Sequence, residues 1–348
     1  MDWAPVLATG VLPLPPWPAV APWWAVLALL CVPALSLAVD HRFGEPPERW
    51  HPVVWMGRAL HWGGKRVAPA APSSPQGAAW HDFKHFCLGV LVWSGFSAIF
   101  LIAYCAVQLV LAQLPAVLAV ALLALVLKPL LAWRMLREEV LAVDAALARS
   151  LEAGRTQLAR LVSRDVSALS AGEVRESAIE SLAENLNDSV VAPLFWFALA
   201  GLPGAALYRF ANTADAMWGY PGMRGGRYWQ WAGKWAARAD DVLSWVPARI
   251  TAGLLALAAR GLPFRPLVHE ARKTPSPNSG WPMAAMALAL DVRLAKPGVY
   301  VLHEQGRVPE SADVARSARL AWWAVLALLP VLAVLQWCAW WVWSRVWS

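Results

Sequence analysis

The sequence predicts an all-α integral membrane protein, a polytopic helical bundle with amphipathic cytoplasmic helices and a polar site that faces the cytoplasm. Hydrophobic residues make up 59% of the 348 residues and charged residues only 15%, a balance unusual for a soluble domain. Several apolar runs are long enough to cross a bilayer. The 24 Trp fit this class, because the indole ring favours the membrane–water interface.

The remaining composition excludes other classes. The formal charge of +7 does not indicate nucleic-acid binding, because Lys and Arg are scattered through loops and form no basic run. The four cysteines lie in apolar stretches without C-x-x-C spacing, which predicts free thiols. No Lys or Arg precedes the first apolar run, so we expect no cleaved signal peptide. We expect residues 1–348 to form one membrane-embedded domain.

The first part of the chain is expected to hold one span. Residues 3–22 are rich in Pro and Trp, which is typical of an irregular or interfacial lead-in. The apolar run 23–39 has the length of a membrane span. Residues 40–60 should form a structured loop and an amphipathic turn, since Gly and Pro interrupt them. Residues 65–79 form a Pro/Ala/Ser linker that we expect to be mobile.

Two further spans are expected close together in the chain. The apolar runs 88–111 and 116–133 are separated by a very short connection that ends at Pro115. We therefore predict that they form an antiparallel helical hairpin. From residue 134 to residue 161 apolar side chains recur at helical spacing against charged ones, which predicts an amphipathic helix.

The next helix carries a line of acids. Ser170 and Glu173 have the spacing of a capping box, which predicts a helix start. Acidic side chains then follow at i+4 intervals on one face, at Glu176, Glu180, Glu184 and Asp188. One interpretation is a solvated face with Arg partners such as Arg175. The other is a cation-binding face, because the helix runs directly into apolar sequence and carboxylates are the ligands Mg²⁺ takes.

The rest of the chain alternates apolar and polar segments. Residues 190–207 are short and interrupted by Pro193, Gly201, Pro203 and Gly204, so we predict a re-entrant or interfacial segment. The final spans are expected at 242–262 and 320–342. We expect 134–189 and 263–319 to be cytoplasmic helical segments, because they hold many of the Lys and Arg residues.

An aromatic, basic stretch follows the interrupted segment. Its Trp residues, at positions 218, 229, 231 and 235, have two interpretations. An interfacial belt is the first. Stacking on a planar ligand is the second.

At this point the residues match a known family. The chain resembles the adenosylcobinamide-phosphate synthases, the CobD/CbiB family of cobalamin biosynthesis, in six pieces that occur in the right order. They are DHRFGEPPERWHPVVWMGR (40–58), LVSRDVSAL (161–169), ESLAENLNDSVVAPLFW (180–196), YRFANTADAMWGY (208–220), ARADDVLSWVPARIT (237–251) and ARKTPSPNSGWPMAAMALAL (271–290).

The resemblance implies a membrane-bound ligase of the bacterial cytoplasmic membrane. Such an enzyme joins the amine of aminopropanol phosphate to the free propionate carboxylate of adenosylcobyric acid, a corrinoid. In such an enzyme ATP supplies the driving force by forming an acyl phosphate, and Mg²⁺ neutralises the triphosphate. The partners implied are the lipid bilayer and other late membrane enzymes of the pathway. The sequence contains no Walker or Rossmann glycine motif, so nucleotide binding is implied by the family alone.

The resemblance also suggests roles for residues in the matching pieces. Candidate catalytic residues are Glu180, Glu184, Asp215, Asp240 and His51. Candidate ligands for substrate or phosphate groups are Arg164, Asn185, Arg249, Lys273 and Asn278. Candidate metal ligands are Glu184, Asp188 and Asp241. For His51 a structural histidine at a loop–helix junction is the alternative, and for Asp240 a salt bridge with Arg238 or Arg249.

Four positions depart from the family pattern, namely Glu45, Ser189, Met283 and Leu288. They leave open a non-catalytic paralogue, corrinoid-binding or regulatory, like the family's AmpE branch. A transporter is the third reading, because intramembrane carboxylates also mark ion pathways.

Overall fold

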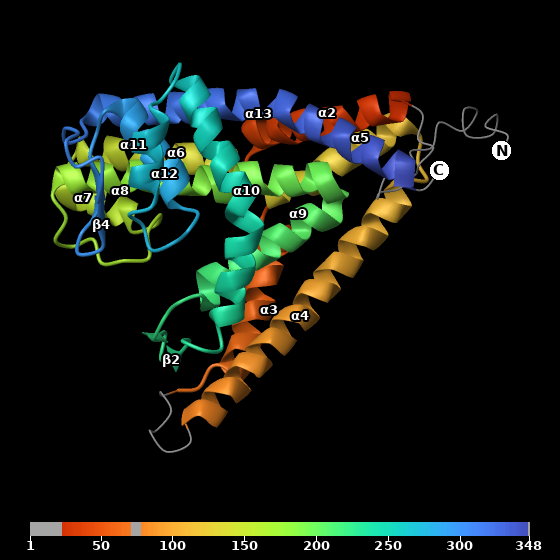
Figure 1. The fold of residues 1–348 in the computed structure, drawn as a ribbon, viewed down its shortest axis with the longest axis horizontal. Helices are drawn as coiled ribbons and strands as arrows, with labels where there is room; N and C mark the ends of the chain where they lie inside the picture. The colour runs from red at the N-terminus through yellow and green to blue at the C-terminus, as the bar shows by residue number, and fades with distance from the viewer. Residues whose placement is uncertain (1–22, 71–77, 347–348) are drawn as a thin grey trace. The chain divides into compact units, whose positions relative to one another are not determined.

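The computed structural model of this chain describes residues 23–70 and 78–346. The lead-in expected over 3–22 and the middle of the linker expected over 65–79 lie outside the described residues, whereas 65–67 and 78–79 are helical. The described part is helical apart from two short antiparallel hairpins and the loops (Figure 1).

The protein is an all-α polytopic membrane protein, as the composition predicted. Helical runs long and apolar enough to cross a bilayer are His81–Leu111, Ala116–Leu147, Ala171–Trp218, Lys234–Ala258 and Ser311–Val342. Four of the predicted spans overlap these runs. Helix α2 (Trp23–Phe43) covers the predicted span at 23–39.

Contacts within the chain divide it into two compact units. Unit 1 comprises Met1–Leu131, Pro193–Leu243 and Leu332–Ser348, and unit 2 comprises Ala132–Ala192 and Ser244–Val331. Because each unit is assembled from separate stretches of sequence, no single cut in the chain separates them. The expectation of one domain over 1–348 stays a prediction.

Unit 1 contains most of the first half of the chain. Its elements are α2, η1 (Glu48–Trp50), α3 (Pro52–Val67), α4 (Ala78–Leu111), α5 (Ala116–Leu127), η2 (Lys128–Leu130), most of α9 (Ala192–Trp218), β1 (Met223–Arg224), β2 (Arg227–Tyr228) and the start of α10 (Lys234–Ala258). Residues 52–60, expected as a turn, belong to the full helix α3. Pro52 occupies its first turn, where a missing N–H costs nothing.

The predicted hairpin of 88–111 and 116–133 is wrong. Helix α5 packs along α2, and α4 packs on α3 (Figure 1). The Ser36 hydroxyl joins α2 to α5 by donating to the carbonyl of Ala124 at 3.0 Å. Helix α4 approaches α3 closely at Gly63, where an added Cβ would lie 2.8 Å from a methyl group of Val92. Specific packing therefore overrides the short connection.

The segment 190–207 is interrupted at Gly201, as its Gly and Pro residues predicted, whereas the helical run continues through Pro193. It lies in a helical run from α8 through the π-turn η3 (Asn187–Val191) into α9. Pro193 has no N–H for the Ser189 carbonyl, which accepts instead from Ala132 N at 3.1 Å. The one sharp kink is Gly201 (φ 68°), and the neighbouring N–H of Leu202 donates to Gln108 Oε1 at 2.7 Å. Whether this run re-enters the bilayer stays a prediction.

The Trp residues of the aromatic stretch pack partly inside unit 1. Trp218 and Trp229 are buried and stacked, with ring centroids 5.8 Å apart, and Trp218 Nε1 donates to the Leu60 carbonyl. An interfacial belt is therefore wrong for these two rings. Cys87, Cys105 and Cys338 are free thiols, as predicted.

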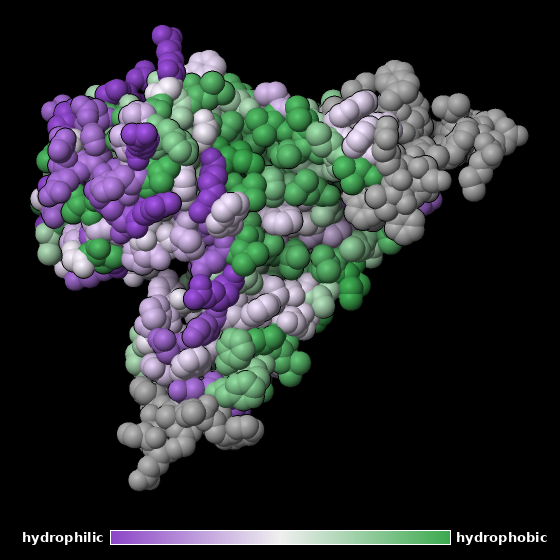
Figure 2. Space-filling model, in the orientation of Figure 1, coloured by the Kyte–Doolittle hydropathy of each residue, from purple (hydrophilic) through white to green (hydrophobic). Residues whose placement is uncertain are grey.

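Unit 2 is built around α8 (Ala171–Leu186), which packs on α6, α7, α12 and β3. Its elements are α6 (Trp133–Leu147), α7 (Leu151–Leu158), α8, η3, the end of α10, α11 (Phe264–Ala271), α12 (Gly280–Leu290), β3 (Leu294–Lys296), β4 (Tyr300–Leu302) and the first part of α13 (Ser311–Val346). Hydrophilic side chains gather at the end of the unit that carries α7 and β4 (Figure 2).

Two local predictions in unit 2 have different outcomes. The capping box of Ser170 and Glu173 is present and starts α8. The single amphipathic helix expected over 134–161 divides at residues 148–150, because Ser150 caps a new helix, α7. The β3–β4 hairpin lies in a segment expected to be helical.

Candidate functional site

Two of the acids of α8 are buried, and Glu173 and Glu184 are partly exposed. Glu176 is 0% exposed and Glu180 is 6% exposed, so the solvated-face interpretation is wrong for them. Arg175, the partner expected in that interpretation, bonds to Asp144 on α6 instead. Buried carboxylates require specific partners.

Glu176 is held by the start of the β-hairpin. It accepts hydrogen bonds from Arg293 Nη2 at 2.9 Å, Arg293 Nε at 3.3 Å and the backbone N–H of Ala295 at 2.9 Å. These bonds, followed by the charge of Glu176, raise the pKa of the Arg293 guanidinium. These contacts hold α8 against β3, one helical turn before Glu180.

Glu180, one turn further along α8, has a cation on one side and a phenol on the other. Its Oε2 lies 3.3 Å from Arg164 Nη2, which also donates to Ser177 Oγ at 2.7 Å. Its Oε1 accepts from the hydroxyl of Tyr300 on β4. Burial, and then the negative charge of Glu180, raises the pKa of Tyr300 far above its ordinary value. Tyr300 therefore keeps its proton and acts as a hydrogen-bond donor to Glu180.

Arg164, Ser177 and Glu180 border a polar cavity of about 150 Å³. Glu184, Asn185 and Lys296 also line it, so carboxylate, amide and ammonium groups share one opening. The complete lining is Leu161, Val162, Ser163, Arg164, Ser177, Glu180, Ser181, Glu184, Asn185 and Lys296. The structure thus brings together four predicted site residues, Arg164, Glu180, Glu184 and Asn185.

The end of α8 carries a second group of polar residues. Asn187 donates to Asp188 Oδ1 at 2.8 Å and accepts from the Thr251 hydroxyl on α10 at 3.1 Å. Asn187 and Thr251 are buried. Asp188 does not line the cavity of Glu184, and its predicted role as a metal ligand stays a prediction.

The other predicted residues of unit 2 lie elsewhere. Arg249 lines a separate, larger cavity, where its Nη1 donates to Asn278 Oδ1 at 2.8 Å. Lys273 Nζ donates to Glu270 at 2.7 Å. Burial acts to raise the pKa of Glu270, but hydrogen bonds from Lys273, from His303 N and at His269 outweigh it and lower that pKa. Lys273, which follows α11, therefore pairs with Glu270 in the last turn of that helix.

The predicted residues of unit 1 are described within that unit. His51 caps α3, because its Nδ1 accepts from Val53 N at 3.3 Å while Nε2 lies 3.0 Å from Glu45 Oε2. His51 thus lies at a loop–helix junction and caps the helix, which is the structural role considered as the alternative to catalysis. Asp215 lies in the last turn of α9, and its carbonyl accepts from Gly219 N at 2.7 Å.

The two adjacent acids of α10 have different neighbours. Asp240 Oδ1 accepts from Asn212 at 3.4 Å. Arg238 lies 3.9 Å from Asp241 Oδ2, so the salt bridge considered for Asp240 forms with Asp241. The catalytic and metal-binding roles of these residues stay predictions.

A buried ion cluster stands beside His51 and was not predicted. Lys128 Nζ lies 2.9 Å from Glu45 Oε2 and 3.4 Å from Asp40 Oδ1. Burial acts to raise the pKa of Glu45, but the hydrogen bonds at His51 and Lys128 outweigh it and lower that pKa. The cluster ties the end of α2 to η2 and the start of α3.

The other departures from the family pattern fit the packing. Ser189 and Met283 are buried. The sulfur of Met283 lies 3.7 Å from the Tyr300 hydroxyl, so Met283 packs against the group that binds Glu180. Leu288 lies within α12.

Lys296, Tyr300 and Arg293 are functional candidates that sequence reasoning missed. A signal was present, because Pro297-Gly298 is typical of a turn between two strands. Recognising the hairpin would have placed these residues together, although not against α8. Within the described ranges, no three His, Cys, Asp or Glu side chains gather as a metal site.

The fold and this cavity define a polytopic α-helical membrane protein with a buried charged site in unit 2. The chain belongs to the family described as CobD/Cbib protein, which matches residues 33–340. No solved structure shows a significant match to it.

Named relatives agree with this assignment. The chain is 40% identical over 280 residues to the probable cobalamin biosynthesis protein CobD of Methanothermobacter thermautotrophicus, covering 77% of this chain and 84% of that protein. It is 40% identical over 292 residues to the protein of the same name in Thermococcus kodakarensis, covering 84% and 90%. It is 34% identical over 322 residues to the cobalamin biosynthesis protein CobD of Brucella anthropi, covering 85% and 93%.

Proposed function

We propose that this protein catalyses the ATP- and Mg²⁺-dependent ligation that joins aminopropanol phosphate to the free propionate of adenosylcobyric acid. The observation that carries the proposal is the cavity at Glu180 and Glu184, where a buried acid, a half-buried acid, an amide and two cations meet in a member of this family. The chemistry forms one amide bond, at the expense of a phosphoanhydride bond of ATP. We place the site on the cytoplasmic side of a bacterial cytoplasmic membrane, where ATP is present.

The residues at the cavity suit Mg²⁺ and phosphate. Mg²⁺ takes one or two carboxylates and completes its shell with phosphate oxygens and water, so Glu184 would suffice as the protein ligand. Bound Mg²⁺ would neutralise charge on the triphosphate. Lys296 and Arg164 would contact phosphate oxygens, because both present N–H donors to the cavity.

The surrounding bonds assign different tasks to the two glutamates. Glu180 is fixed by Arg164 and Tyr300, so it orients the arginine that would face phosphate. Glu184 lines the cavity one turn later. It is the residue we propose to contact the metal or to accept the proton that the attacking amine must lose.

The test uses the purified full-length protein with adenosylcobyric acid, aminopropanol phosphate and Mg-ATP. We expect adenosylcobinamide phosphate to form with release of ADP, and Glu184→Gln and Lys296→Met to lower kcat/KM by about 10²-fold or more. Glu152→Gln is the matched control, because that side chain on α7 is 81% exposed. Corrinoid binding without any product would instead favour the non-catalytic relative.

A further inference from the structure

A second cavity in unit 2, of about 790 Å³, lies beside α10 and is not used by the proposed reaction. Small residues of α10 line one side of it, namely Ala252, Gly253 and Ala256. Aromatic side chains including Trp245, Trp281 and Phe264 line other parts. No Asp or Glu is among its described lining residues, whereas Arg249 and Arg272 are. The cavity is therefore apolar along its length and positively charged.

Arg249 is held in a fixed orientation at this cavity. Its guanidinium lies 4.3 Å from the ring centroid of Trp245 and 4.9 Å from that of Trp281. Nη1 donates to Asn278 Oδ1 at 2.8 Å and to the Trp245 carbonyl at 2.7 Å, and Nη2 donates to the Pro277 carbonyl at 3.1 Å. A guanidinium has five N–H groups. The Nε–H and one Nη2–H therefore remain for an anion.

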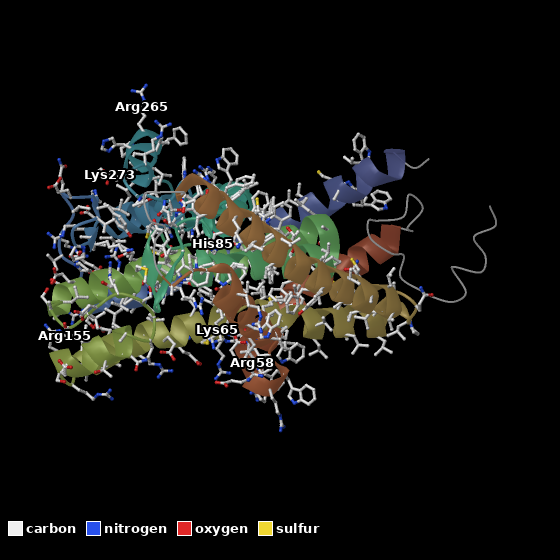
Figure 3. All side chains as sticks on the ribbon, turned by 90° about the horizontal axis from the view of Figure 1, so that it is seen from below. Arg58, Lys65, His85, Arg155, Arg265 and Lys273 are labelled. Carbon is white, nitrogen blue, oxygen red and sulfur yellow. The ribbon has the colours of Figure 1, made fainter. Side chains whose placement is uncertain are left out.

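The surroundings of the cavity are those of a membrane surface. Helix α10 is long and apolar enough to cross a bilayer, and Val242, Trp245 and Leu257 are exposed on it. The short helix α11 follows, with Phe264 72% exposed and Arg265 projecting outward (Figure 3). Exposed aromatic and apolar side chains on such a helix are typical of a surface that contacts lipid.

We propose that this cavity binds a phospholipid of the bilayer. One acyl chain would lie against Ala252, Gly253 and Ala256, and the anionic headgroup would bind Arg249 and Arg272. The eleven residue steps from Trp245 to Ala256 extend about 16 Å along the helix, which suits a chain rather than a compact phosphate. The proposal does not rest on the ligase reaction. The phosphate group that the sequence predicted at Arg249 would then be that of a lipid headgroup.

Gly253 provides a test that leaves Arg249 intact. An added Cβ at Gly253 meets no heavy atom within 4 Å, so Gly253→Phe should fill the cavity without disturbing the fold. Gly95 on the predicted span α4 has equally open surroundings and is exposed. Gly95→Phe is therefore the matched control, with Arg249→Gln as the variant that removes the charge.

The experiment measures lipid binding to the full-length protein in detergent. Phosphatidylglycerol or phosphatidylcholine is added, retained lipid is counted by native mass spectrometry, and the Tm is recorded. We expect phosphatidylglycerol to be retained and to raise the Tm more than phosphatidylcholine does. Gly253→Phe and Arg249→Gln should each weaken its binding about tenfold or more, whereas Gly95→Phe should not.

Three results would overturn the proposal. Equal lipid retention by all variants would mean that the lipid binds only as a general annulus. Equal retention of the two lipids with no effect of Arg249→Gln would remove the headgroup contact. A stabilisation by glycerol phosphate or Mg-ATP that depends on Arg249 and matches that of phosphatidylglycerol would assign the site to a soluble phosphate ligand.

Discussion

Replacing Arg293 by Met is expected to destabilise unit 2 strongly, because it leaves a buried carboxylate without its cation. Glu176 is 0% exposed and receives two of its three hydrogen bonds from Arg293. Only the backbone N–H of Ala295 would remain. Removing one partner of a fully buried ion pair costs about 3–5 kcal/mol. Solvent screening reduces the expected cost here to about 2–3 kcal/mol, because the Arg293 side chain is 37% exposed. We expect a loss of that size in the free energy of unfolding.

Unfolding of the purified chain in detergent, followed by circular dichroism in urea, measures this loss. Arg160→Met is the matched control, since Arg160 is 64% exposed and pairs with Glu139 at 2.7 Å. An exposed pair is worth about 0–1 kcal/mol. The double variant Arg293→Met with Glu176→Leu should recover most of the stability, because the buried charge is gone. Equal losses for Arg293→Met and Arg160→Met would refute the reasoning.

Three further predictions use the same unfolding assay. Lys128→Met should cost about 3–5 kcal/mol, since Asp40 and Glu45 lose their cation, and a loss below 1 kcal/mol would mean that water replaces it. Trp218→Ala should also cost about 3–5 kcal/mol, because the ring is fully buried, unless the helices close over the space. The pKa of Glu270 is lower in the folded chain than in the unfolded one, so its stabilisation is present above about pH 4.3 and is lost as the pH falls through the folded pKa. The stability advantage over Glu270→Gln should therefore shrink between pH 7 and pH 3, and a constant difference would contradict this.

The α8 acids show how far sequence reasoning could go toward the site. Their i+4 spacing placed Glu176, Glu180 and Glu184 on one face, and the structure keeps them there. The different partners of these acids could not be predicted from the sequence. Glu176 pairs with a residue 117 positions away, and Glu180 with one 120 positions away. No local pattern encodes such a pair, because it depends on where the hairpin folds back onto the helix.

The same distinction explains the errors in the fold. A short connection suggested that α4 and α5 pair. Instead, the Ser36 hydroxyl of α2 bonds to α5, and Gly63 of α3 allows α4 to approach α3 closely. Pro193 and Gly201 suggested a broken segment. A π-turn before Pro193 lets the helix continue there. At Gly201 the backbone does leave the helical conformation, and the Gln108 side chain accepts a hydrogen bond from the neighbouring N–H of Leu202.

The sequence by itself determined the membrane class, most span positions, the capped start of α8 and the line of acids along it. Each of these depends on apolar run length or on contacts within a few residues, which local composition records. Only the tertiary structure decided which acids are buried, which cations and phenol bind them, and that Arg249 lies in a different cavity from Glu184. Burial and pairing depend on residues brought together from distant parts of the chain, and their energies are set by the loss of water around them.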